Sequence, residues 1–386
     1  MADESSSSQH FETQAIHAGH NYVNDTGAVI PPVYLSSTFE YGNPGGFDYT
    51  RSGNPNFRNL DATLSQLEGS QFCTSFGSGV SAITAVVSTL KSGDLVLAEE
   101  NIYGCTFRLF AQVFAKFGVE IEYLDFTSAE ALKQIDAKKP ALVWMESPTN
   151  PLLKVIDIAK VAEASKAAGS SLIVDNTFAS SYLQRPIELG ADVSLLSTTK
   201  YSNGHSDCLG GAVCTNSEEW HDKMVFAQKA LGLQPSPFDT WLITRGLKTE
   251  AIRMERHSSN ALKLAKFLED ESPAEMVRYP FLKSHPQYRI AKKQMRAGSG
   301  IVTADLGISL KKTLKFLETL RYFPKAESLG GIESLCCHPA SMTHASVPKK
   351  TREKVGITDS LVRFSVGIEH VDDLIEDLGS AFEVIA

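Results

Sequence analysis

The sequence predicts an α/β protein with a mostly parallel sheet, followed by a smaller α+β domain at the C-terminal end. From about residue 61 to residue 245, short apolar runs alternate with amphipathic segments of helical spacing. The apolar runs carry hydrophobic residues on both faces, which is typical of parallel strands covered by helices on either side. The alternation becomes sparser after residue 245, and 386 residues suffice for two domains.

The predicted elements follow the chain in three parts. Residues 1–48 are rich in Gly, Pro, Asn and Ser and predict an extended arm, residues 49–245 the α/β domain, and residues 246–386 the smaller domain. Ser128 is a typical N-cap, and Gly118 and Gly169 are typical helix ends. Strands are predicted at 94–99, 120–125, 141–146, 171–176, 192–198, 210–215, 300–307 and 361–368, and helices at 81–91, 104–118, 128–136, 158–169, 249–270, 310–320 and 371–386.

The composition excludes several classes of protein. A net charge of −8 argues against a nucleic-acid-binding surface, and no apolar run is long enough to cross a bilayer. The opening residues MADESSSSQH lack the apolar core of a secretory signal, so we expect a cytoplasmic protein with a disordered serine-rich tip.

The cysteines predict reduced thiols and no metal site. None of the six forms a CxxC pair, which favours free thiols over a disulfide framework. Cys336, Cys337 and His338 are consecutive, and three consecutive residues rarely bind one ion.

Lys200 is the first candidate for chemistry. It follows the apolar strand SLLST and is surrounded by hydroxyls, among them Ser197 and Thr199. A solvated surface lysine is the ordinary alternative. A lysine buried at the end of a strand loses solvation of its charge, its pKa falls, and its free amine becomes the nucleophile that a Schiff base requires.

Three further features fall at the carboxyl ends of predicted strands, where open parallel sheets bind ligands. SFGSGVSAI, residues 75–83, is a glycine-rich turn entering a helix, so its residues Gly77, Ser78, Gly79 and Val80 would hold a phosphate, although a plain helix entry also uses glycine. Asp175 ends a buried strand and is either a helix cap or a partner for a protonated pyridine nitrogen. Tyr103 opens a helix after a strand and either fills the core or stacks on an aromatic ring.

The longer motifs resemble those of the pyridoxal phosphate (PLP) enzymes of cysteine and methionine metabolism. The motifs are SPTNP at 147–151, VDNTFASSYLQRPIELGADVSLLSTTKYSNGHSD at 174–207 and RGLKT at 245–249, with AIHAGH, PPVYLSSTF, YTRSGNPNFRNLD, AESLGGIESL and PASMTHASV elsewhere. The resemblance runs from Phe11 to the C-terminus. It implies the aspartate-aminotransferase fold (PLP fold type I) and a homotetramer built from two dimers.

The resemblance also implies roles for individual residues. Those on the cofactor are Lys200 (covalent), Asp175 (ring nitrogen), Tyr103 (ring stacking), Asn150 (ring hydroxyl), and Gly79, Val80, Ser197 and Thr199 (phosphate), with Tyr49 and Arg51 reaching the phosphate of the neighbouring subunit. Those on the substrate are Arg363 at its carboxylate, Ser328, Thr343 and Tyr49 beside it, and Glu327 and Arg108 in the distal pocket. Arg108 also fits a surface ion pair, and Ser328 and Thr343 fit loop caps. His205 and His344 are expected to be structural hydrogen-bonding residues.

The implied reaction is cleavage of the Cγ–S bond of cystathionine to cysteine, 2-oxobutanoate and ammonia, with hydrogen sulfide released from cysteine or homocysteine as a side reaction. Lys200 would move protons and Tyr103 would protonate the leaving sulfur. Glu327 and Arg108 favour γ-lyase or γ-synthase activity, whereas Cys105 in YGCTF resembles methionine γ-lyases, and β-lyases share the scaffold. Gly77 also departs from the family, which often has serine there. A non-catalytic scaffold is disfavoured because Lys200, Asp175, Tyr103 and Arg363 are all present.

Overall fold

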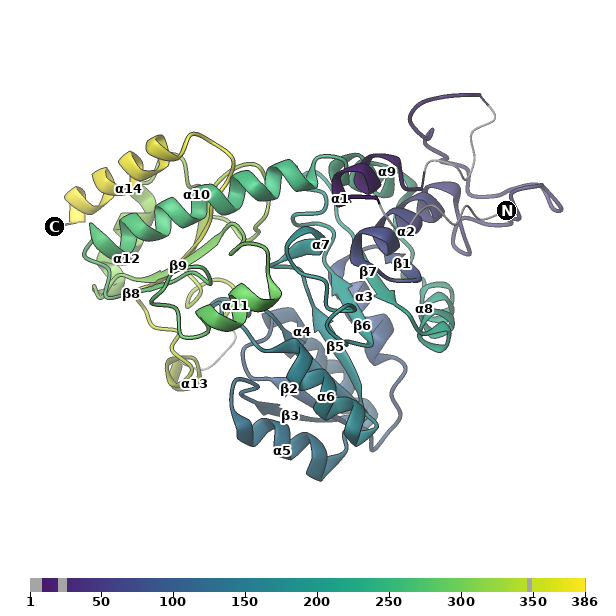
Figure 1. The fold of residues 1–386 in the computed structure, drawn as a ribbon, viewed down its shortest axis with the longest axis horizontal. Coiled ribbons are helices and arrows are strands. Elements are labelled where there is room, and N and C mark those ends of the chain that lie inside the picture. The colour runs from purple at the N-terminus through teal and green to yellow at the C-terminus, as the bar shows by residue number, and fades with distance from the viewer. Residues whose placement is uncertain (1–8, 20–25, 346–348, 386) are drawn as a thin grey trace.

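The computed structural model describes residues 9–19, 26–345 and 349–385 (Figure 1). The serine-rich tip at residues 1–8 lies outside the described residues. A seven-stranded sheet has the order β1-β7-β6-β5-β4-β2-β3. Strands β2 to β6 run parallel, while β7 is antiparallel to both β6 and β1. The strands are β1 (Phe72–Phe76), β2 (Leu95–Glu99), β3 (Glu120–Leu124), β4 (Leu142–Glu146), β5 (Ser171–Asp175), β6 (Val193–Leu196) and β7 (Gly211–Thr215).

Helices cover both faces of this sheet, which explains why its central strands are apolar throughout. In β4, Leu142 and Trp144 pack into the core on one face, and Val143 and Met145 pack into the core on the other. Side chains alternate between the faces of a strand, so a strand buried on both sides needs apolar residues at every position. The helices are α2 (Pro55–Glu68), α3 (Gly79–Val87), α4 (Gly104–Arg108), α5 (Ala129–Lys138), α6 (Ile158–Ala168), α7 (Ser180–Leu183), α8 (Glu218–Ala230) and α9 (Pro237–Leu247).

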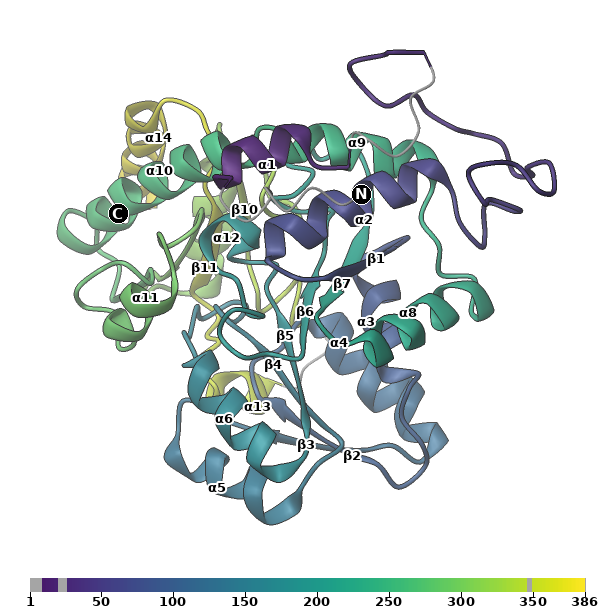
Figure 2. The ribbon, with the colours of Figure 1, turned by 45° about the vertical axis from the view of Figure 1, so that its right-hand side comes forward.

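The C-terminal part carries a four-stranded antiparallel sheet with the order β10-β11-β9-β8. The long helix α10 (Glu250–Asp270) runs from the first sheet to the second (Figures 1 and 2). Helix α14 packs against α10, and α12 packs against α14. The remaining elements are β8 (Met276–Arg278), α11 (Tyr288–Gln294), β9 (Ile301–Asp305), α12 (Leu310–Thr319), β10 (Leu335–Cys337), α13 (Lys349–Lys354), β11 (Leu361–Ser365) and α14 (Val371–Ile385).

Two sequence expectations were wrong in detail. The N-terminal arm contains a helix, α1 (Phe11–His17), which is anchored because the Phe11 ring meets the Tyr182 ring edge-on at 5.0 Å. The single helix expected at 104–118 is instead α4, a π-helical turn at Leu109–Val113 and a 3₁₀ turn at Phe114–Phe117, ending at Gly118 in the left-handed region. Several elements were not predicted at all: strands β1, β8 and β10, and helices α7, α8, α9, α11 and α13.

The predicted domain boundary at residues 245/246 falls inside α9 and stays a prediction. None of the helices in the described part of the chain is long and apolar enough to span a membrane.

Candidate active site

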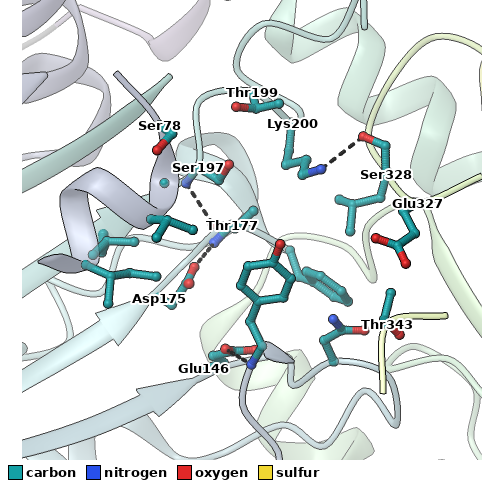
Figure 3. Close-up of a pocket in the computed structure, with 18 of the residues that line it drawn as sticks. Ser78, Glu146, Asp175, Thr177, Ser197, Thr199, Lys200, Glu327, Ser328 and Thr343 are labelled. Carbon is teal, nitrogen blue, oxygen red and sulfur yellow. Dashed lines mark hydrogen bonds between the residues drawn. The ribbon is translucent and has the colours of Figure 1, made fainter. Parts of the chain in front are cut away.

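A cavity of about 250 Å³ lies at the carboxyl ends of β4, β5 and β6, where the main sheet meets the C-terminal part of the chain (Figure 3). It brings together residues that are far apart in the sequence, as expected for a ligand site at this edge of a parallel sheet. Of the predicted site residues, those lining the cavity are Gly79, Val80, Tyr103, Asn150, Asp175, Ser197, Thr199, Lys200, Glu327, Ser328, Thr343 and Arg363.

Lys200 projects into this cavity just beyond the end of β6. Its Nζ donates a hydrogen bond to Ser328 Oγ at 2.9 Å, as Figure 3 shows. Burial, followed by the positive charge of Arg363, lowers the pKa of the Lys200 amine to about 8, while Glu327 and Cys105 act in the opposite direction. A substantial fraction of this amine is therefore neutral near physiological pH, which is the state that attacks a carbonyl carbon.

Asp175 ends β5 and lies on the opposite wall of the cavity. One carboxylate oxygen accepts a hydrogen bond from the Thr177 backbone N–H at 3.0 Å, and the side chain forms no ion pair within the described residues. Burial raises the pKa of the Asp175 carboxyl. A buried carboxylate without a cation partner is costly, so this position favours a ligand that brings a positive charge.

Glu146 ends the neighbouring strand β4, in direct register with Asp175. Its carboxylate accepts a hydrogen bond from the backbone N–H of Tyr103. Burial, followed by the charge of Asp175, raises the pKa of Glu146 well above its ordinary value. Because two buried carboxylates in such proximity resist ionising together, Glu146 retains its proton and Asp175 carries the charge.

The glycine-rich turn between β1 and α3 forms an anion cradle. Ser78 caps α3, its Oγ accepting the Ser81 N–H at 3.0 Å. A Cβ atom on Gly79 would lie 2.8 Å from Ser197 Cβ, so only glycine leaves this space open. The free N–H groups at the start of α3 and its dipole attract a phosphate. Thr199 Oγ1 meanwhile contacts the Gly210 backbone, donating to its carbonyl at 3.2 Å and accepting its N–H at 3.0 Å.

Arg363 on β11 supplies a fixed fork of donors at the other end of the cavity. Its Nη1 donates to Asn150 Oδ1 and its Nη2 to the Ser328 carbonyl, each at 2.9 Å. Its Nε has no hydrogen-bond partner among the described residues. A buried guanidinium held in this way is suited to binding a carboxylate.

Comparison with known proteins agrees with this geometry. A family model for Cys/Met metabolism PLP-dependent enzymes matches residues 12–383. The chain belongs to this family. Cystathionine gamma-lyase from Dictyostelium discoideum is 45% identical over 96% of this chain and 97% of its own length. Cystathionine beta-lyase from Coxiella burnetii is 43% identical over 99% of this chain and all of its own length. The structure of cystathionine gamma synthase from Xanthomonas oryzae pv. oryzae in complex with cystathionine superposes with a TM-score of 0.94 at 40% identity, over 98% of each chain.

The cavity of this PLP-dependent enzyme fits its cofactor. The turn at Gly79 has room for the phosphate. Asp175, which has no cation partner, would pair with the protonated ring nitrogen. The Lys200 amine, with its lowered pKa, would react with the aldehyde. Each part of the cofactor thus meets a feature that is otherwise unexplained.

Three predicted residues do not line the cavity of their own chain. The side chains of Tyr49 and Arg51 are exposed, and Arg51 Nη1 donates to the Lys229 carbonyl at 3.2 Å. Arg108 is also exposed and donates to Cys105 Sγ at 2.7 Å. None of these three side chains therefore lines the cavity of its own chain.

His205 and His344 form hydrogen bonds within the protein, as the sequence predicted. His205 contacts the Asn203 carbonyl at 2.7 Å, and His344 contacts Thr343 Oγ1 at 2.9 Å. All six cysteines are free thiols. Both ring nitrogens of His338 contact protein oxygens, which leaves none for a metal ion.

Sequence reasoning missed Glu146, Thr177, Phe178 and Leu209 as residues that line the cavity. For Glu146 a signal was available in the sequence, because it ends an apolar strand just as Asp175 does. In the structure the two residues are register partners on neighbouring strands. For Thr177 the only sequence signal was its position two residues after Asp175. Its Oγ1 accepts a hydrogen bond from the Ser197 N–H at 2.8 Å, which connects the segments that follow β5 and β6.

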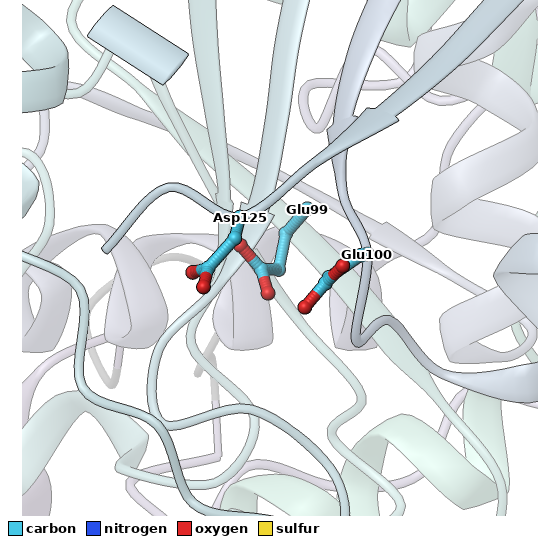
Figure 4. A group of neighbouring side chains, drawn as sticks. All are labelled: Glu99, Glu100 and Asp125. Carbon is cyan, nitrogen blue, oxygen red and sulfur yellow. The ribbon is translucent and has the colours of Figure 1, made fainter. Parts of the chain in front are cut away.

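A second acidic group, Glu99, Glu100 and Asp125, has the proximity of a metal site (Figure 4). Lys154 Nζ lies 3.7, 2.9 and 3.4 Å from their carboxylates. The ammonium group supplies the cation that these carboxylates need, so the group is an ion-pair network in which Glu99 is the buried member.

Proposed function

We propose that this enzyme cleaves the Cγ–S bond of L-cystathionine to give cysteine, 2-oxobutanoate and ammonia. The observation that carries the proposal is the convergence on one cavity of the Lys200 amine, the Arg363 fork and the Glu327 carboxylate. Arg363 suits the α-carboxylate of an amino acid, and Glu327 suits a second, distal amino group. Cystathionine carries both groups, and several relatives are named for it.

The chain's own residues divide the work of such a reaction. Bound PLP supplies an electron sink for negative charge at the substrate Cα. Arg363 binds the substrate carboxylate and thereby orients the Cα–H bond. Lys200, whose pKa of about 8 lies near neutrality, takes the proton from Cα and then transfers protons at Cβ from the same position. Ser328, 2.9 Å from the amine, holds Lys200 in place.

Tyr103 is the proposed acid for the leaving sulfur. Burial and the neighbouring Cys105 raise the pKa of its phenol, so the hydroxyl keeps a proton to donate. Its backbone is held by Glu146, which fixes the start of α4. Thr343 and Glu327 lie near one another on the same side of the cavity (Figure 3).

We further propose that each active site is shared between two chains of a homotetramer in the cytoplasm. Tyr49 and Arg51 are exposed and lie outside the cavity of their own chain, which suits a role toward the phosphate in a neighbouring chain. Tyr49 would also contact the substrate there. Cysteine or homocysteine in place of cystathionine would release hydrogen sulfide.

Product analysis tests the reaction. The purified enzyme with PLP is incubated with L-cystathionine, and the 2-oxo acid is identified by mass spectrometry. The proposal expects 2-oxobutanoate. Pyruvate would establish Cβ–S cleavage, as in a β-lyase, and would contradict the proposed orientation of the substrate against Glu327.

Two other activities are tested in the same preparation. Cystathionine formed from an activated homoserine ester and cysteine would indicate a γ-synthase. Faster release of 2-oxobutanoate from methionine than from cystathionine would indicate a methionine γ-lyase, the activity that Cys105 favours.

A further inference from the structure

Gln184 directly follows helix α7 and has a buried side chain that does not line the active-site cavity. Its amide nitrogen uses both of its donor positions. Nε2 donates to the Ser147 carbonyl at 2.7 Å and to Asn176 Oδ1 at 3.0 Å. Because a backbone carbonyl can only accept, the contact with Ser147 fixes which end of the amide is the nitrogen.

The two groups that Gln184 binds come directly after the two carboxyl residues at the strand ends. Ser147 follows Glu146 on β4, and Asn176 follows Asp175 on β5. Glu146 and Asp175 are the last register pair of these two strands. Gln184 therefore bridges the strands one residue beyond that pair.

The bridge belongs to a larger hydrogen-bond network. Asn176 Nδ2 donates back to the Gln184 carbonyl at 2.8 Å, so these two residues bond in both directions. Gln184 Oε1 accepts from Gln294 Nε2 at 3.0 Å, and the same nitrogen donates to the Ile156 carbonyl at 2.9 Å. Gln294 is the last residue of α11, in the C-terminal part of the chain. Every polar atom of the Gln184 amide is thus paired, which holds the side chain in one orientation.

We propose that Gln184 is a positioning residue that sets where the Asp175 carboxylate meets the ring nitrogen of PLP. The inference rests on the pairing of Asp175 with that nitrogen, and it does not depend on which bond of the substrate is cleaved. The strength of a charge pair depends on its distance, and groups that bind a ligand are held in place by hydrogen bonds from the residues around them. Without the bridge, the ends of β4 and β5 would be free to move relative to one another.

The test compares PLP with its carbocyclic analogue, in which a ring C–H replaces the ring nitrogen. The analogue keeps the phosphate and the aldehyde, so it lacks only the group that pairs with Asp175. Gln184→Met removes the hydrogen bonds of the side chain and keeps a similar volume. Fluorescence titration of the cofactor-free, full-length chain measures the affinity for each ligand. Gln184→Met is expected to weaken PLP binding about tenfold and to change binding of the analogue by less than about twofold.

Asn260→Leu is the matched control for the loss of a buried amide. Asn260 also donates to two carbonyls, those of Gly367 and Glu369 at 3.0 and 2.9 Å, and none of these residues lines the cavity. This control should leave the affinity for both ligands unchanged.

Gln294→Met is the second variant, and it decides the question if Gln184→Met does not fold. It removes the contact that holds Gln184 Oε1 and leaves the bonds from Gln184 to Ser147 and Asn176 in place. We therefore expect the same selective effect at a smaller size, with PLP binding weakened about threefold and the analogue unchanged.

Asp175→Asn separates failure of the inference from failure of the pairing on which it rests. This variant should weaken PLP binding by more than about tenfold and leave the analogue within about twofold. Equal loss of both ligands in Asp175→Asn would show that the pairing is wrong, and the inference would fail with it. If Asp175→Asn is selective for PLP but the glutamine variant weakens both ligands equally, or neither, the inference alone is overturned.

Discussion

At the scale of single residues, the site depends on charges placed where water cannot reach them. Burial is the main cause of the pKa shifts of Lys200, Asp175 and Glu146. It lowers the pKa of the amine and raises the pKa of both carboxyls, so the consequences differ. The amine moves toward neutrality and becomes reactive, while one of the paired carboxyls takes up a proton and the other keeps its charge. Burial in one cavity therefore makes Lys200 a nucleophile on one wall and makes Asp175 a partner for a cation on the other.

The depressed pKa of Lys200 predicts how cofactor capture depends on pH. Only the neutral amine attacks the aldehyde, so below the pKa the rate of PLP attachment to cofactor-free enzyme should rise about tenfold per pH unit. With a pKa of about 8, the rate should level off near that value. Stopped-flow absorbance across a pH series measures this. A rate that keeps rising toward the ordinary lysine pKa of 10.5 would contradict the burial argument.

At the scale of elements, the phosphate cradle depends on the close approach of two turns. The turn at Gly79 starts α3, and Ser197 follows β6; their contact leaves no room for a side chain at position 79. The strands themselves place both turns at one edge of the sheet, which is why residues over a hundred positions apart meet there.

Gly79→Ala tests this approach. The added methyl group would push against Ser197, so we expect a loss of stability of about 1–3 kcal/mol and a drop in PLP affinity of at least about tenfold. Gly379→Ala in α14 is the matched control, because nothing lies within 4 Å of its added Cβ. That control should gain about 0.5–1 kcal/mol from its higher helix propensity. Denaturant unfolding and PLP titration measure both; unchanged PLP affinity in Gly79→Ala would refute the cradle.

Sequence reasoning succeeded where one local pattern determined an element. The two-sided apolar strands, the Ser128 cap and the ending of α6 at Gly169 were all predicted, because each depends on nearby residues. The structure of residues 104–118 was not predicted correctly, because helical spacing in the sequence does not reveal the change from α-helix to π and 3₁₀ turns. Helix α1 was missed because it is short and held by a distant ring, that of Tyr182.

The residues proposed to bind the cofactor could be named from the sequence, and they line one cavity, but their contacts could not be predicted. Lys200 and Asp175 follow apolar strands, and the family resemblance identified Arg363. The Lys200–Ser328 and Arg363–Asn150 hydrogen bonds join positions 128 and 213 residues apart, which no local pattern encodes. The pairing of Cys105 with Arg108 is local, yet its geometry depends on where α4 ends.

At the scale of the whole molecule, the proposed shared site makes one chain insufficient for activity. Lys200 would come from one chain and Arg51 from its neighbour. Isologous dimers contain two such sites, each drawing on both chains.

Mixing two inactive variants tests this arrangement. Lys200→Ala and Arg51→Ala are unfolded together and refolded as a mixture, with each variant refolded alone as the control. About half of the randomly formed dimers are then mixed, and one of their two sites is intact, so activity should return to about one quarter of wild type. A mixture no more active than either variant alone would show that each chain carries a complete site.

The most direct test of the central claim is the identity of the lysine that holds the cofactor. The enzyme is loaded with PLP, reduced with borohydride to make the link permanent, digested, and mapped by mass spectrometry. We predict a single modified peptide with PLP on Lys200, and none in Lys200→Ala. PLP on any other lysine, or no modified peptide from the wild-type enzyme, would contradict the account of the site.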